Sequence, residues 1–302
     1  VLNELTQAFN EALTDSSRLV LLSGIGEVFS CGIDLAHITK WSPVPSSSSS
    51  CETKSDKTDT SSNASTSSSN ANNPADQGRR SRSSMRSIKE NSAEESVVAD
   101  KKQSTSSSTT SSRAAGLNNS VEVKSMLKEL KQFLDTLIAF PKPIIAGVNG
   151  PAIGLAVAIL PLCDLIYASD KATFYLPYTR LNQTPEGGAT YSLAALIGMP
   201  LANDLLLAGR KLTAREAQQR ALVSDVLFPT NFKNELFAKC KSVAKSSPMA
   251  LEMIKCIIRI RDRSRLEFAV QTECQKLEKL WQSPEFIISA HRFLDNEMTE
   301  YI

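Results

Sequence analysis

Glu186 is the carboxylate whose neighbours suggest chemistry, because it stands between Thr184-Pro185 and the pair Gly187-Gly188. Thr184 as N-cap, Pro185 as the first helical residue and Glu186 in the first turn predict a helix start, where the helix dipole stabilises the acid. The two glycines weaken such a turn by roughly 1 kcal/mol each relative to alanine. A backbone without side chains beside a carboxylate lets a substrate lie against it. Glu186 is therefore a candidate catalytic acid or base, with an ordinary helix N-terminus as the alternative.

The segment 143–158 is expected to bring backbone N–H groups close to a ligand. An apolar run over 144–148 predicts a strand, Gly150-Pro151 predicts a turn, and small residues over 152–158 predict a helix. Small residues let the N–H groups at a helix start, which carry partial positive charge, approach a ligand without a side-chain clash. A tightly packed turn inside a core is the alternative.

A second glycine-containing loop, 24–35, joins a predicted strand to a short helix. Gly24 and Gly26 match two glycines of a dinucleotide-binding fingerprint, but the third is absent at the required position, so that class of site is not expected. Asp34 suits the N-cap of a helix that continues through Leu35, Ile38 and Trp41. The loop thus connects a buried strand to a helix start, as the segment 143–158 does.

Other kinds of catalytic or metal site find little support in the sequence. His37 and His291 are the only histidines, and neither lies near a motif such as G-x-S-x-G, so a nucleophilic triad is not expected. The six cysteines form no C-x-x-C pair and have no histidine partner at metal spacing. We therefore expect no metal site and a reduced, intracellular compartment. Cys31 has no base within reach in the sequence and is expected to be a packing residue.

Composition divides the chain into three parts. Residues 42–120 are rich in Ser, Thr and Asn, hold almost no large apolar side chains, and are expected to form a disordered insert. Residues 1–41, whose start we expect to be truncated, and residues 121–302 together predict one domain of roughly 220 residues. The net charge of +2 gives no reason to expect nucleic acid on the folded part. No apolar run reaches the roughly 18 residues that predict a membrane span.

Helices and strands alternate early in the folded part, and helices predominate later. Helical spacing of apolar residues predicts helices at 1–14, 121–140, 201–208, 213–220, 232–246, 248–261 and 266–281. Short apolar runs predict strands at 18–23, 144–148, 162–168, 172–176 and 222–228. This order describes an α/β core with a helical C-terminal layer.

Three ordered motifs, at 29–35, 149–156 and 162–168, resemble the crotonase (enoyl-CoA hydratase/isomerase) superfamily. The resemblance implies an α/β fold built as a spiral of ββα units, with a C-terminal helical layer that mediates a homotrimer. It also implies a coenzyme A thioester as substrate or ligand, with no permanently bound cofactor. The superfamily's oxyanion hole falls on the backbone N–H groups of Ile33 and Leu155, which would stabilise the charge that develops on a thioester oxygen.

The resemblance assigns an acyl-CoA site to these loops and to the stretch after the strand at 172–176. The assigned positions are Ser30, Gly32, Ile33, Asp34, Leu35, Gly150, Gly154, Leu155, Pro177 and Leu181. The two catalytic glutamates of hydratases would fall at Ala158 and Tyr178, and neither side chain can do acid/base work on water. Hydration by the standard two-glutamate route is therefore not expected.

Two subgroups resemble this chain and imply different functions. The motif 184–187 is similar to peroxisomal-type 3-enoyl/2-enoyl-CoA isomerases, in which one carboxylate, here Glu186, takes a proton from C2 and returns it at C4. The segments 149–154, 159–164 and 209–213 resemble the C-terminal domain of chromodomain Y-like corepressors, a group that tends to carry aspartate at the position of Glu186.

The first resemblance implies an isomerase of fatty acid metabolism in a mitochondrion or peroxisome. The second implies a catalytically degenerate module that binds CoA and chromatin corepressor proteins in the nucleus, and the Ser-rich insert, which kinases could phosphorylate, favours this group. We prefer the isomerase as the activity and the nucleus as the location, and both interpretations stay open.

Overall fold

The computed structural model of the chain describes residues 1–40 and 109–296. The segment 42–120, expected to be a disordered insert, therefore lies outside the described residues as far as residue 108. Its last part differs from the expectation, because helix α3 (Thr109–Ala139) begins at Thr109 rather than at residue 121. The helix ends shortly before Pro141, as predicted from the clash of a proline ring with a helical residue before it.

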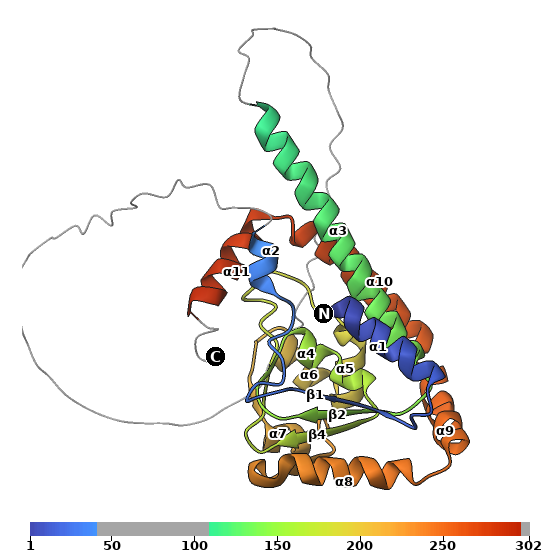
Figure 1. Cartoon of the computed structure of the whole chain (residues 1–302). Coiled ribbons are helices and arrows are strands. Elements are labelled where there is room, and N and C mark those ends of the chain that lie inside the picture. Colours follow the sequence, from blue (N-terminus) through green and yellow to red (C-terminus); the bar gives the residue numbers. More distant parts are fainter. Residues whose placement is uncertain (41–108, 297–302) are drawn as a thin grey trace, which may run out of the picture. The chain divides into compact units, whose positions relative to one another are not determined.

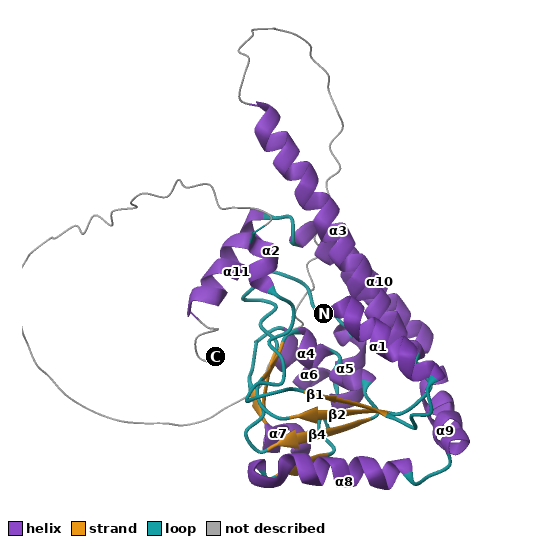
Figure 2. Ribbon diagram, in the orientation of Figure 1, coloured by secondary structure: helices purple, strands orange, loops and turns teal. Residues whose placement is uncertain are grey.

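The remaining elements follow the predicted order (Figure 2). The strands are β1 (Val20–Ser23), β2 (Ile144–Val148), β3 (Ala152–Ile153), β4 (Leu165–Ser169), β5 (Thr173–Tyr175), β6 (Leu212–Thr213) and β7 (Asp225–Leu227). The other helices are α1 (Leu2–Thr14), α2 (Leu35–Thr39), α4 (Leu155–Ala158), α5 (Ala189–Ile197), α6 (Met199–Leu206), α7 (Ala214–Gln219), α8 (Phe232–Ala244), α9 (Pro248–Ile260), α10 (Arg263–Leu280) and α11 (Pro284–Asn296). Two short 3-10 helices are η1 (Leu160–Leu162) and η2 (Pro229–Asn231).

The larger sheet is parallel, with the strand order β1-β2-β4-β7 (Figure 1). In its interior, β2 pairs with β1 at Val20 and Ile144, and with β4 at Ile145 and Leu165. Every residue of β2 is buried. A continuous apolar run is typical of a parallel strand covered on both faces, so the sequence-based prediction of this strand is confirmed.

The two faces of this sheet meet different partners, because successive side chains of a strand point to opposite sides. Ile144 and Ala146 join the main core, whereas Ile145 packs in a smaller cluster with residues of α8. Gly147 leaves room for α8, since a Cβ at this position would lie 2.3 Å from Cδ2 of Leu236. Glycine therefore lets α8 approach the sheet closely, and Figure 1 shows this helix running along β4.

A small sheet, β3-β5-β6, holds the two predicted loops against each other. Ser30 forms a parallel bridge to Ala152, which brings the loop after β1 onto β3. The helix predicted over 152–158 begins later than expected, because Ala152 and Ile153 form the strand β3. Gly154, with φ of 58°, then turns the chain so that the helix α4 begins only at the next residue.

The C-terminal helices form the predicted layer. α10 packs against α3 and α5, and α11 packs against α2. α11 was not assigned from the sequence, although Phe286, Ile287, Ala290 and Phe293 are buried at the spacing of one helix face. The predicted α/β core with a helical C-terminal layer is thus confirmed. No helix in the described ranges is long and apolar enough to cross a membrane.

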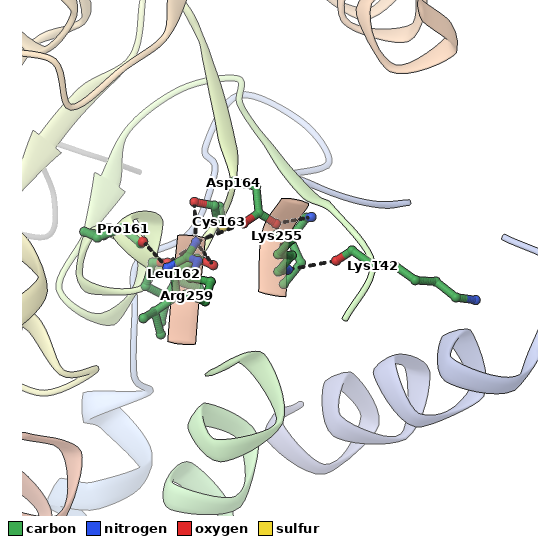
Figure 3. A network of polar contacts seen from close by, with 9 residues as sticks. Lys142, Pro161, Leu162, Cys163, Asp164, Lys255 and Arg259 are labelled. Atoms are coloured by element: carbon green, nitrogen blue, oxygen red, sulfur yellow. Dashed lines mark hydrogen bonds and ion pairs between the residues drawn. The ribbon is translucent and has the colours of Figure 1, made fainter. Parts of the chain in front are cut away.

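Helix α9 is attached to the core by its polar side (Figure 3). Lys255 Nζ lies 2.7 Å from Asp164 Oδ2 and donates to the carbonyl of Lys142 at 2.8 Å. Arg259 donates to Asp164 Oδ1 at 3.1 Å and to carbonyls at the end of η1. Burial lowers the pKa of Lys255, and the charge of Asp164 opposes that shift. Asp164 is therefore the counter-ion that makes the burial of this lysine tolerable.

Replacing Asp164 with alanine is expected to destabilise the protein by about 3–5 kcal/mol, because Lys255 would remain buried without its counter-ion. Urea unfolding at constant protein concentration measures the loss. The control is Asp135→Ala. Asp135 forms an ion pair with Lys131, and the Asp135 side chain is 44% exposed. That loss should stay below about 1 kcal/mol, and equal losses in the two variants would contradict the assignment.

Candidate active site

Glu186 lies in the loop before α5, not in the first turn of a helix. The N-cap of α5 is Gly188, and the Thr184 hydroxyl is buried without a hydrogen-bond partner, so the expected helix start at Pro185 is wrong. Gly187 and Gly188 have φ values of 77° and 73°, in the left-handed region. Two successive residues in that region cannot continue a right-handed helix, which therefore begins after them.

The two glycines also allow close packing on both sides of the loop. A Cβ at Gly187 would lie 2.9 Å from Cβ of Ala158, and a Cβ at Gly188 would lie 3.3 Å from Val270 of α10. The interpretation that they leave open backbone for a substrate is therefore corrected: they fasten the loop between α4 and α10. This places Glu186 with little room to move its backbone.

The carboxyl group of Glu186 has the electrostatics of an acid/base catalyst. Its residue is 2% exposed, and Oε2 has no hydrogen-bond partner. Burial raises its pKa to about 8, the negative charge of Glu273 acts in the same direction, and a hydrogen bond from the Leu155 N–H acts against them. A carboxyl group that titrates near neutral pH can both accept a proton and return it.

Two cavities have Ile33 in their walls, and Glu186 lines the smaller of them. The larger, about 580 Å³, lies between α1, α3 and the loop before α2, and Leu155 is part of its wall. The smaller, about 20 Å³, contains Glu186. Ile33 lines both cavities.

Most residues that the resemblance assigned to acyl-CoA are brought together here. Those on the larger cavity are Gly32, Ile33, Asp34 and Leu155. Those on the smaller cavity, beside Glu186, are Ile33, Leu35, Gly154, Pro177 and Leu181. Ser30 lines neither cavity, but its Oγ accepts a hydrogen bond of 3.1 Å from the Gly32 N–H and shapes the loop.

Gly150 is not brought to the site. A Cβ at this position would lie 1.7 Å from the carbonyl oxygen of Glu27. Its absence of a side chain therefore allows close contact between two loops, and the assignment of Gly150 to ligand binding stays a prediction.

Gly32, the neighbour of Ile33, lies directly against the backbone at the start of α4. Gly32 has φ of 81°, and a Cβ there would lie 2.6 Å from the Ile153 carbonyl and 3.2 Å from the Leu155 nitrogen. The Leu155 N–H is one of the donors at the start of α4, which have no partner within the helix. This N–H acts on the Glu186 carboxyl group and opposes the rise of its pKa. A thioester oxygen would have to replace Glu186 at that donor.

Sequence reasoning missed several residues of the small cavity. Trp281 and Gln183 both line it, and Trp281 Nε1 donates to Gln183 Oε1 at 2.9 Å. Phe293 of α11 also lines it. Tyr178 also lines this cavity with a buried hydroxyl. Burial raises the pKa of Tyr178 well above its ordinary value, so this hydroxyl is neutral.

Glu273 of α10 was also missed, although the sequence contains a signal for it. It shares a buried helix face with Leu266, Val270 and Leu277. A glutamate among apolar residues at helical spacing is unusual unless it has polar partners in the core. Across residues 1–40 and 109–296, no group of three or more His, Cys, Asp and Glu side chains could hold a metal ion.

A family model described as Enoyl-CoA hydratase/isomerase matches residues 88–301. The chain belongs to this family. A crystal structure of an enoyl-CoA hydratase/isomerase from Pseudoalteromonas atlantica T6c has a TM-score of 0.66 at 23% identity, covering 97% of this chain and 86% of that one. An enoyl-CoA hydratase from Mycobacterium avium subsp. paratuberculosis K-10 has a TM-score of 0.66 at 21% identity, covering 98% and 85%. At these identities the likeness shows the fold alone.

Relatives in this family carry two kinds of name. Testis-specific chromodomain protein Y 1 of Homo sapiens is 32% identical over 301 residues, 100% of this chain and 42% of the relative. Chromodomain Y-like protein of Homo sapiens is 31% identical over 301 residues, 100% of this chain and 38% of the relative. Enoyl-CoA delta isomerase 2 of Rattus norvegicus is 39% identical over 165 residues, 55% of this chain and 42% of the relative. The matched region covers less than half the length of each of these relatives. The expected similarity to both subgroups is confirmed.

Proposed function

We propose that the protein binds acyl-CoA and acts as an enoyl-CoA isomerase that moves a double bond from the 3- to the 2-position. The observation that carries this proposal is the buried Glu186, whose Oε2 is unpaired and faces a cavity shared with Ile33. A buried polar atom without a partner is costly, so such an atom is more easily understood if a ligand approaches it.

The proposed reaction needs one proton carrier. Ionised Glu186 removes a proton from C2 of the 3-enoyl thioester, and the electron pair of that C–H bond moves toward the carbonyl, whose oxygen becomes negative. The N–H groups of Ile33 and Leu155 stabilise this oxygen. The protonated Glu186 then gives the same proton to C4 as the double bond settles between C2 and C3. No proton is gained or lost overall.

The proximity of the Leu155 N–H to Glu186 has a consequence for this reaction. In the absence of ligand, the Leu155 N–H opposes the rise of the pKa of Glu186. A thioester oxygen that takes the Leu155 N–H would remove this effect and raise the proton affinity of Glu186. Substrate binding would thus strengthen the base that acts on it.

The test is incubation of the purified protein with a 3-enoyl-CoA and measurement of 2-enoyl-CoA by absorbance and mass spectrometry. Formation of the 2-enoyl product supports the proposal. No product would contradict it, and a 3-hydroxyacyl product would indicate addition of water instead.

The second candidate is a catalytically degenerate module that binds CoA and recruits chromatin corepressor proteins. Two observations favour it: the chromodomain relatives match 100% of this chain, and the cavity at Glu186, about 20 Å³, is the size that holds one water rather than an acyl chain. Acyl-CoA binding measured by calorimetry without turnover would support this function over the first. The two candidate functions predict different locations for the protein. The corepressor module would lie in the nucleus, and the isomerase would lie in a mitochondrion or peroxisome.

We also propose that the protein forms a homotrimer through α9. The side of α9 opposite its ion pairs is apolar, and its side chains are more than half exposed at Met253, Ile254, Ile257, Ile258 and Ile260. The buried pair of Lys255 with Asp164 turns this face outward. A contiguous exposed apolar face is typical of a protein–protein interface, and a second copy of the chain is the occupant that the family resemblance implies.

Ile257→Lys is expected to convert the trimer into monomers, because it places a charge on an apolar contact surface. Light scattering coupled to gel filtration measures the mass. Ile288→Lys is the control, since Ile288 is 47% exposed on α11 and should leave the mass unchanged. A wild-type protein that is already monomeric, or a trimeric Ile257→Lys variant, would contradict this interface.

A further inference from the structure

The buried carboxylate of Glu273 is held by the N-terminus of α5. Its residue is 4% exposed. Oε2 accepts a hydrogen bond of 2.7 Å from the Gly188 N–H, and Oε1 accepts bonds of 2.9 Å and 2.6 Å from the N–H and the hydroxyl of Thr190. Both oxygens thus accept hydrogen bonds from the first residues of a helix, where partial positive charge favours the ionised form. Burial raises the pKa of Glu273, and these hydrogen bonds oppose that rise.

These contacts fix the backbone two residues from Glu186. Gly188, which donates to Glu273, also packs against Val270 and Leu266 of the same helix, at 3.3 Å and 3.7 Å from a Cβ placed on it. α10 therefore holds the Glu186 loop by one charged contact and two apolar ones. The loop lies between α10 and α4, so the direction of the Glu186 side chain depends on this attachment.

The charge of Glu273 also acts on Glu186. After burial, it is the next cause that raises the pKa of Glu186. The other groups that face Glu186 are the Leu155 N–H, the neutral Tyr178 and Cys274, whose pKa burial and the two glutamates raise to about 11. No lysine, arginine or histidine of the described residues is among the causes of the shift at Glu186. The one charged group among the causes of this shift, Glu273, is therefore negative.

We propose that Glu273 is a positioning residue: by accepting hydrogen bonds from Gly188 and Thr190, it orients the loop that carries Glu186 and places a second carboxylate near that acid. The proposal rests on the proposed function for its meaning in catalysis. Its electrostatic part concerns the protein without substrate and can be tested independently. A purely structural Glu273 would hold α5 without changing the titration of Glu186.

The test is a carbon-13 NMR titration of protein labelled at the glutamate carboxyl carbons. The resonance of Glu186 is assigned by its loss in Glu186→Gln. Glu273→Gln is expected to lower the titration midpoint of Glu186 by about one unit, because it removes a like charge. An unchanged or raised midpoint would overturn the proposal.

A matched pair at Thr190 covers the case in which Glu273→Gln does not fold. Thr190 is exposed, and both Thr190→Lys and Thr190→Val lose its hydroxyl donor to Glu273 while keeping the backbone donor. The lysine adds a positive charge beside Glu273 and should lower the Glu186 midpoint relative to the valine variant. Equal midpoints in the two variants would overturn the electrostatic role.

Catalytic measurements then separate this proposal from the proposed function. In an active enzyme, Glu273→Gln should move the acid limb of the kcat/KM profile to lower pH and reduce the plateau about threefold, because a weaker base removes the proton more slowly. A protein that turns over no 3-enoyl-CoA would refute the isomerase assignment, while a lowered Glu186 midpoint in Glu273→Gln would still support the effect of Glu273.

Discussion

Glu186→Gln is expected to lower kcat for 3-enoyl-CoA isomerisation by about a thousandfold or more. Glutamine keeps the shape of the side chain but can neither accept the C2 proton nor return it at C4. Removal of a positioned acid/base group typically costs two to four orders of magnitude, and here one group performs both proton transfers. The buried carboxyl also lacks a nearby replacement, since Glu273 uses both its oxygens to bind Gly188 and Thr190.

The measurement is steady-state formation of 2-enoyl-CoA, with acyl-CoA binding determined in parallel by calorimetry. Binding should change little, because the proposed oxyanion donors Ile33 and Leu155 are intact. Glu285→Gln serves as the control, since Glu285 is exposed in the first turn of α11. A Glu186→Gln variant that keeps its rate would exclude Glu186 as the proton carrier.

The stability of Glu186→Gln relative to the unchanged protein is expected to increase with pH by a few kcal/mol. The pKa of Glu186 is about 8 in the folded protein and 4.5 as its ordinary value. Below pH 4.5 the group is protonated in both states and contributes no pH dependence. Between pH 4.5 and 8 the unfolded chain loses its proton first, so the folded state becomes less stable as pH rises. Above pH 8 the buried group is ionised and the loss is complete.

Each unit of difference in pKa corresponds to about 1.4 kcal/mol, which sets this scale. Glutamine does not titrate, so the variant avoids the loss. Urea unfolding at pH 5 and pH 9 measures it, and the gap between Glu186→Gln and the unchanged protein should widen at the higher pH. Glu285→Gln should show no such widening. A gap of the same size at both values would mean that Glu186 titrates normally.

The two expectations have one physical origin. Burial of Glu186 without a partner for Oε2 destabilises the folded protein at alkaline pH, and the same burial gives the carboxyl group a proton affinity suited to neutral pH. A residue that weakens the fold while serving a reaction is expected at a functional site.

The elements with a long apolar period could be predicted from the sequence alone. α1, α3 and α8 to α10 are long enough for a helical face to be recognised, and the continuous apolar run of β2 identified a buried parallel strand. Asp34 was predicted as an N-cap, and its side chain accepts a hydrogen bond from the His37 N–H. These features depend on residues close together in the chain, so local composition determines them.

The site was only partly predictable. The sequence identified Glu186 as an unusual carboxylate, and family resemblance pointed to Ile33 and Leu155. The two-residue strands β3 and β6 have too few residues to produce a recognisable period. The start of α5 depends on left-handed glycines pressed between α4 and α10, a condition that neighbouring residues do not reveal.

The sequence by itself determined the family, the order of the main elements and the acid worth testing. The tertiary structure decided the environment of that acid: its burial, the charge of Glu273 from 87 residues further along the chain, and the bond from Leu155. It also decided that α9 turns its apolar side outward, because Asp164 holds Lys255 and Arg259 on the inner side. Proton affinity and burial depend on which distant residues meet, and only the folded chain brings them together.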